Sequence, residues 1–95
     1  MTTEELLRQL RQLKRTLEQL GSEFAQGHVD GPLLAEIDRM VDGGLAHDPR
    51  LAELCMILEQ LRETTLTPRP ELYSDGIRHC RHAKAVIEER MAELA

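Results

Sequence analysis

Aromatic side chains are almost missing from this chain, which contains Phe24, Tyr73 and no tryptophan. The core must therefore be aliphatic, and leucine is its main component. Leucine is a strong helix former, whereas the β-branched and aromatic residues that favour strands are scarce. The shortage of aromatics also removes the platforms on which proteins stack single-stranded bases. Composition thus predicts an all-α protein and disfavours single-stranded nucleic acids as ligands.

Long apolar runs are also lacking, and none approaches the roughly 18 residues that a membrane-spanning helix needs. The segment at 1–5 is acidic, unlike the basic start of a signal peptide. Cysteine occurs only at Cys55 and Cys80, far apart and outside any CxxC spacing. Such a pair is typical of buried thiols in a reducing compartment. We expect a cytoplasmic protein without membrane contact.

Positive charge is in short supply, because 12 Lys and Arg face 17 Asp and Glu, giving a net charge of −5. The excess is concentrated in residues 21–66, which hold nine acidic and three basic side chains. Residues 1–20 hold four basic and three acidic ones. An acidic middle repels phosphate backbones, so nucleic acid is not an expected partner.

Helix signals divide the 95 residues into four segments within a single domain, 1–95. Thr2 with Glu5 forms a capping-box pattern, and Pro32 and Asp48-Pro49 are typical of helix starts. The β-branched pair Thr64-Thr65 predicts a fraying end before the connector that contains Pro68. The expected helices cover approximately 3–26, 32–42, 49–64 and 70–93.

Glycines mark the breaks and one close approach. Residues 27–31 predict a loop, in which His28 is expected to be solvated. Gly43-Gly44 ends the second helix, and 45–47 is expected to be a short linker. Gly76 is the one weak position in the last helix, and it is expected to permit close approach of a neighbouring helix.

The strongest pattern is a leucine seam in the first helix, with spacings of 4, 3, 4, 3 and 4. The leucine seam consists of Leu6, Leu10, Leu13, Leu17, Leu20 and Phe24. It can close a core within one chain, or it can form an interface with a second chain. A chain this short has a small core, which favours self-association. We predict a small four-helix bundle, or a pair of helical hairpins, completed by dimerisation through this seam.

A polar cluster in the last helix is a candidate metal site. Glu71, Asp75, His79 and His82 are spaced 4, 4 and 3, so they share one face. Carboxylates and imidazoles bind zinc, iron and manganese. The competing interpretation is a solvated polar face opposite the apolar stripe. Asp75, His79 and His82, or the two cysteines, give an alternative function as a metal- or redox-responsive protein.

The last helix also carries Arg78, Arg81 and Lys84, a row that either docks on an acidic partner or is simply solvated. The sequence contains no recognisable catalytic constellation, and we expect neither an enzyme nor a cofactor. The favoured function is a protein–protein interaction module acting through the leucine-rich first helix. An adaptor, small chaperone, antagonist or accessory subunit all fit, with another protein or a second copy as partner.

Overall fold

The computed structural model describes residues 2–95, and over this range it contains four α-helices, two 3-10 turns and no strand. The all-α prediction is confirmed. The helices are α1 (Thr3–Ala25), α2 (Gly31–Asp42), α3 (Ala52–Leu66) and α4 (Leu72–Leu94), with the turns η1 (Leu45–His47) and η2 (Pro49–Leu51) between α2 and α3.

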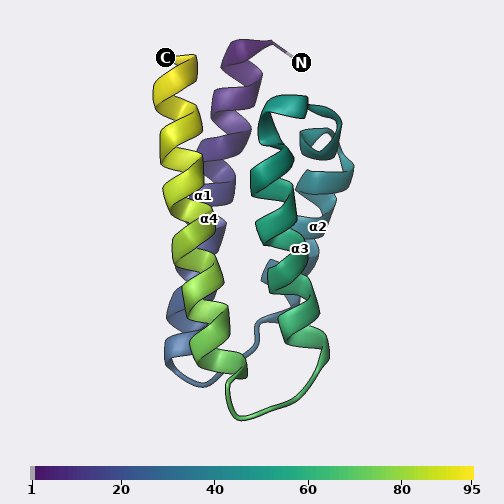
Figure 1. The fold of residues 1–95 in the computed structure, drawn as a ribbon, viewed down its shortest axis with the longest axis vertical. Coiled ribbons are helices and arrows are strands. Elements are labelled where there is room, and N and C mark those ends of the chain that lie inside the picture. Colours follow the sequence, from purple (N-terminus) through teal and green to yellow (C-terminus); the bar gives the residue numbers. More distant parts are fainter. Residues whose placement is uncertain (1) are drawn as a thin grey trace.

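The helices form an up-and-down bundle that measures 40 × 21 × 20 Å (Figure 1). Consecutive helices run antiparallel, so both ends of the chain lie at the same end of the bundle. The long helices α1 and α4 pack against each other along their length, α3 packs on α4, and the shorter α2 packs on α1. Short connections between antiparallel neighbours are typical of such bundles.

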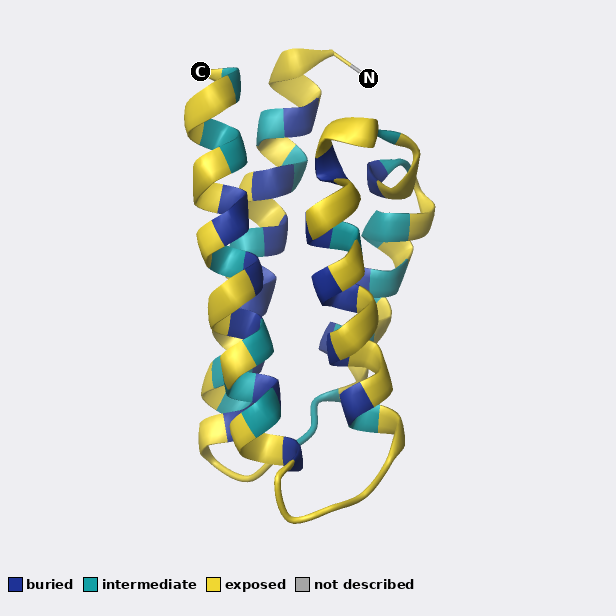
Figure 2. Cartoon of the chain, in the orientation of Figure 1, coloured by how far each residue is buried: buried dark blue, intermediate teal, exposed yellow. Residues whose placement is uncertain are grey.

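The leucine seam belongs to the buried core, and buried positions recur along the length of α1 (Figure 2). Every side chain of the seam is at most 1% exposed. The side chains that surround it, including Leu45, Leu54, Leu61 and Ile87, are equally buried and come from the same chain. Burial of each such side chain stabilises the fold by about 1.5–3 kcal/mol relative to exposure.

Two of the predicted helix starts are confirmed by their caps. The Oγ1 of Thr2 accepts a hydrogen bond from the Glu5 amide at 3.2 Å, and Oδ1 of Asp30 accepts one from the Leu33 amide at 3.1 Å. Each bond satisfies an amide that has no partner within its own helix. Pro32 occupies the first turn of α2, where a missing N–H costs nothing.

The third helix differs from its prediction at both ends. Its expected first turn, at 49–51, is the separate 3-10 turn η2, because Asp48 accepts the Arg50 amide at 2.9 Å and the Leu51 amide bonds to the Asp48 carbonyl. Its expected end at Thr64 is wrong, since α3 continues to Leu66. Thr64 is buried, and the Thr65 hydroxyl donates to the Arg62 carbonyl at 2.7 Å. Packing and this bond offset the weak helix propensity of threonine.

The connections also differ in detail. The expected linker at 45–47 is the turn η1, and Leu45 is fully buried in the core. The last helix begins at Leu72 rather than at 70, because Pro70 and Glu71 lie in a turn before it. None of the helices is long and apolar enough to cross a membrane in the part of the chain that the structure describes.

The predicted close approach at Gly76 is confirmed. Gly76 is buried on α4 against the ring of Phe24, the last member of the leucine seam. A β-carbon at this position would lie 2.8 Å from two carbons of that ring. The absence of a side chain therefore lets α1 and α4 pack closely at this end of the bundle.

Candidate functional site

The predicted interface residues of the leucine seam lie inside the bundle. All six are covered by α2, α3, α4 and the turns of the same chain, and none has more than 1% of its surface exposed. A partner that contacted them would have to displace one of these elements. The outward faces of the helices are the surfaces that this closed fold offers to other molecules.

The candidate metal residues of α4 do not meet. The Asp75 carboxylate lies between two guanidinium groups, with Arg69 at 2.8 Å and Arg78 at 3.0 Å. Burial, followed by the charge of Arg78, lowers the pKa of His79. Asp75, His79 and His82 do not form a group of close ligand atoms within residues 2–95. Asp75 instead ties the α3–α4 connector to the first turns of α4.

A different group of potential ligands lies at the α1–α2 corner. Ligand atoms of Glu23, His28 and Asp30 are all within 4.8 Å of one another, and Nδ1 of His28 is 3.0 Å from Oε2 of Glu23. The corner is a Schellman motif. The Gly27 amide donates to the Phe24 carbonyl, the His28 amide donates to the Glu23 carbonyl, and Gly27 has a φ of 75°.

The sequence patterns considered above do not include this group, although its signals are present in the chain. Gly27 is the left-handed residue after α1, and the motif places the side chains of Glu23 and His28 side by side. Asp30 is nearby because it caps α2. The His28 ring is committed to Glu23 and one Asp30 oxygen to the Leu33 amide, so the group is accounted for by the two helix ends.

Both cysteines are free thiols in protected positions. Burial raises the pKa of Cys80 to about 12, and it also raises the pKa of Cys55. The Cys55 thiol lies 3.7 Å from the Leu45 carbonyl and donates to it. A thiol held protonated is a poor nucleophile and a poor metal ligand.

We expect native protein to protect Cys80 from a soluble thiol reagent at neutral pH. Cys80 is 4% exposed, so labelling should occur only after unfolding, whereas the partly exposed Cys55 should react slowly in the native state. Peptide mass mapping after timed labelling, with and without denaturant, measures both sites. Labelling of native Cys80 as fast as that of Cys55 would show that the α1–α4 interface opens readily.

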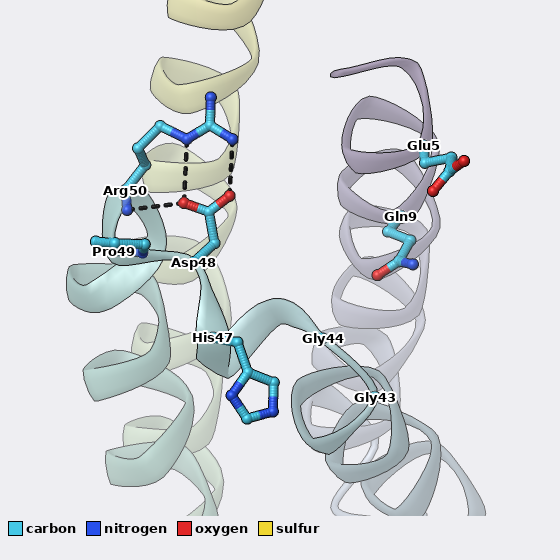
Figure 3. A pocket seen from close by; sticks show the side chains of 8 residues that line it. All are labelled: Glu5, Gln9, Gly43, Gly44, His47, Asp48, Pro49 and Arg50. Carbon is cyan, nitrogen blue, oxygen red and sulfur yellow. Dashed lines mark hydrogen bonds and ion pairs between the residues drawn. The ribbon is translucent and has the colours of Figure 1, made fainter. Parts of the chain in front are cut away.

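A hollow at the end of the bundle that holds the chain termini lies between the start of α1 and the α2–α3 connection (Figure 3). Its polar lining includes Glu5, His47, Asp48 and Arg50. The Asp48 carboxylate accepts three hydrogen bonds from Arg50, from the amide at 2.9 Å, Nε at 3.0 Å and Nη2 at 2.8 Å. These bonds lower the pKa of Asp48 to about 2. Asp48 is therefore a clamp for the turn η2.

This clamp predicts a pH-dependent contribution to stability. The folded pKa of Asp48 lies below the ordinary value of 3.8, so its stabilisation is present above about pH 4 and lost as the pH falls toward about 2. We expect Asp48→Asn to lower the melting temperature at neutral pH, and the gap from wild type to close in acid. Thermal unfolding followed by circular dichroism at a series of pH values measures this gap.

Asp42→Asn is the matched control, because Asp42 is exposed and has no ion pair among residues 2–95. Its melting curve should follow that of wild type at every pH. A gap between Asp48→Asn and wild type that persists unchanged in acid would contradict the role of the carboxylate.

Half of the 12 Lys and Arg side chains form ion pairs within residues 2–95, whereas the three arginines of α1 do not. Lys14 pairs with Glu88 at 3.3 Å, and Lys84 pairs with Glu18 at 3.7 Å. Six Lys and Arg side chains in the described chain have no carboxylate within 4.0 Å: Arg8, Arg11, Arg15, Arg39, Arg62 and Arg81. Four of these six belong to α1 and α2.

Three of these cations form a continuous row, the arginine ridge (Arg8, Arg11, Arg15). Their spacing of 3 and 4 residues places them on one face of α1, and all three are exposed. Like charges at these spacings repel each other by a few tenths of a kcal/mol. The ridge is thus a local concentration of positive charge on a protein whose net charge is −5.

A groove of about 530 Å³ runs between the arginine ridge and α2. Gln12 links its two walls, since Nε2 donates to Oε1 of Glu36 at 3.1 Å and Oε1 accepts from Nη2 of Arg15 at 3.0 Å. The groove is therefore lined by Arg8, Arg15 and Arg39 but by only one carboxylate, that of Glu36, which already accepts a hydrogen bond from Gln12. The α1–α2 groove is lined by Arg8, Gln9, Gln12, Arg15, Glu36, Arg39, Met40 and Gly43.

The basic row of α4 is less available than its sequence suggests. Arg78 pairs with Asp75 at 3.0 Å and Lys84 pairs with Glu18, which leaves Arg81 as the one member without an ion pair in residues 2–95. The row on α4 is a candidate from sequence, whereas the arginines of α1 are evident as a group only in the structure. The missed signal was the exact 3-4 spacing of Arg8, Arg11 and Arg15.

Comparison of the chain with protein-family models, with curated proteins and with solved structures finds no match in any of the three.

Proposed function

We propose that the protein is a non-enzymatic protein–protein interaction module, and that α1 presents the recognition surface on its outward face. The observation that carries the proposal is the arginine ridge, which is exposed and has no carboxylate partner in residues 2–95. Arginine is enriched at interfaces because it combines a fixed fork of donors with a long apolar stem. An adaptor, small chaperone, antagonist or accessory subunit needs such a surface.

The recognition surface differs from the one that the sequence favoured, although the helix is the same. The leucine seam supports the module indirectly, since its burial fixes one face of α1 against the core and leaves the ridge exposed. A second copy of the chain has the acidic character that the ridge needs, so a homodimer is a form of this proposal. We place this activity in the cytoplasm, where free thiols such as Cys55 and Cys80 persist.

Site-specific crosslinking in the cells of origin tests the proposal. A photoreactive residue at Gln19, which is exposed beside the ridge on α1, should give an adduct of discrete mass after irradiation. The same residue at Gln60, which is exposed on α3, is the matched control and should not give this adduct. The adduct should disappear when all three ridge arginines are replaced by glutamate. Identical adducts from both positions, or no adduct, would contradict the proposal.

The metal- or redox-responsive alternative receives no comparable support from the site. Asp75 is held by two arginines, and the pKa of Cys80 is raised to about 12. Elemental analysis of the purified protein tests this alternative directly. A transition metal present in stoichiometric amount would favour the metal-responsive function over the interaction module.

A further inference from the structure

The α1–α2 groove combines positive charge with a small apolar surface. Arg8 and Arg15 lie on the α1 wall, and Arg39 lies on the α2 wall together with Met40, which contributes apolar area. Met40 is partly buried and packs on the core, so its position is fixed. The groove is therefore suited to a ligand that carries negative charge at two points and an apolar group between them.

The spacing along α1 narrows the choice of ligand. Arg8 and Arg15 are seven residues apart, which corresponds to about 10 Å along a helix axis. Two carboxylates one heptad apart on a second helix have the same separation, with apolar side chains one turn from each. Each guanidinium has five donors, so Arg15 can hold Gln12 and still bind a carboxylate.

Charge around the groove disfavours a long polyanion. The exposed surface of α2 and α3 carries carboxylates that include Asp42, Glu59 and Glu63. A nucleic acid that ran across this surface would be repelled by these carboxylates and by the net charge of −5, whereas a short acidic helix does not have to extend across it. The charge pattern thus favours a protein segment.

We infer that the α1–α2 groove binds an acidic amphipathic helix of a partner protein, with two carboxylates a heptad apart on Arg8 and Arg15 and an apolar side chain on Met40. This inference rests on the proposed function and specifies its partner. Binding of an amphipathic helix in a groove between helices is a common mode of peptide recognition. Arg39 on the opposite wall adds attraction and orients the helix.

Fluorescence anisotropy with a synthetic peptide tests the inference. The probe is a labelled helix-forming peptide of about 15 residues with glutamates at i and i+7 and leucines between them, and its control has glutamine at both positions. The glutamate peptide should bind more tightly than the glutamine peptide, and Arg8→Glu with Arg39→Glu should weaken it about tenfold or more. Arg62→Glu, an exposed unpaired arginine on α3, should change its affinity less than about twofold.

Charge reversal supplies the decisive arm. A peptide with lysine at i and i+7 should bind a variant with both Arg8→Glu and Arg15→Glu, and it should not bind wild type. Circular dichroism shows that the variant is folded before its affinity is measured. Equal binding of the glutamate and glutamine peptides, equal loss with Arg62→Glu, or no rescue would overturn the inference.

Two further outcomes identify a different occupant. An oligonucleotide that displaces the peptide would show that the groove binds a polyanion, and concentration-dependent amide shifts around Gln12 in protein alone would show that it binds a second copy. Either result overturns the inference of a partner helix. If the glutamate peptide does not bind the groove but crosslinks from Gln19 still require the arginine ridge, the inference is wrong and the proposed function is not. Failure of the inference and failure of the proposed function are therefore distinguishable.

Discussion

Replacing Leu13 with glutamate should unfold the chain. Leu13 has no exposed surface and lies at the middle of the leucine seam. Burying an unpaired carboxylate there costs several kcal/mol, in addition to the lost packing of the leucine. The whole stability of a small domain is only about 5–15 kcal/mol, so the variant should lose its helical circular dichroism signal at room temperature.

Leu13→Ala and Gln19→Glu make this experiment quantitative. The alanine variant should be folded but less stable by about 2–5 kcal/mol in denaturant unfolding. Gln19→Glu adds the same charge to the exposed face of the same helix and should change stability by less than about 0.5 kcal/mol. If Leu13→Glu is fully helical and only reduces the mass of an oligomer, the seam is an interface between chains and the closed bundle is contradicted.

Replacing Gly76 with alanine should also destabilise the protein strongly. The new β-carbon would lie 2.8 Å from two carbons of the Phe24 ring, and that ring is 1% exposed and cannot move aside without disturbing the core. Overpacking of this kind costs about 1–3 kcal/mol, which exceeds the gain of up to about 1 kcal/mol in helix propensity. The melting temperature should fall by several degrees.

Gly21→Ala is the matched control for this substitution. Gly21 lies within α1, and a β-carbon there would be 3.6 Å from the nearest atom, the β-carbon of Cys80, which is ordinary contact. The helix propensity gain should then dominate and raise stability by about 0.5–1 kcal/mol. Phe24→Leu should partly rescue Gly76→Ala, because the smaller side chain frees space. A stabilised Gly76→Ala would contradict the close packing of α1 on α4.

The elements of the fold that could be predicted from sequence are those fixed by local chemistry. Thr2 and Asp30 satisfy amides within three residues of themselves, so their patterns indicate helix starts without knowledge of the fold. The 4-3 spacing of the leucine seam likewise identifies the buried face of α1, because this periodicity lies within one segment of the sequence. By contrast, the end of α3 was misplaced, because burial of Thr64 by other helices outweighs its weak local propensity.

The candidate site could be predicted only in part, because it depends on how helices are placed. The ridge was present in the sequence as Arg8, Arg11 and Arg15, but the groove beside it exists only once α2 packs on α1. The polar face of α4 had metal-like spacing, yet Arg69 reaches Asp75 across the connector and occupies it. The sequence also does not decide whether the same chain or a second chain covers the leucine seam, because the periodicity is the same in both cases.

The concentration dependence of unfolding tests the central claim most directly, namely that one chain covers its own leucine seam and leaves the outward face of α1 for recognition. A self-contained bundle has a melting temperature that does not change with protein concentration, whereas a bundle completed by a second chain becomes more stable as the concentration rises. Thermal unfolding followed by circular dichroism over about a hundredfold range of concentration should give superimposable curves. A melting temperature that rises steadily with concentration, together with loss of helix on dilution, would contradict the claim.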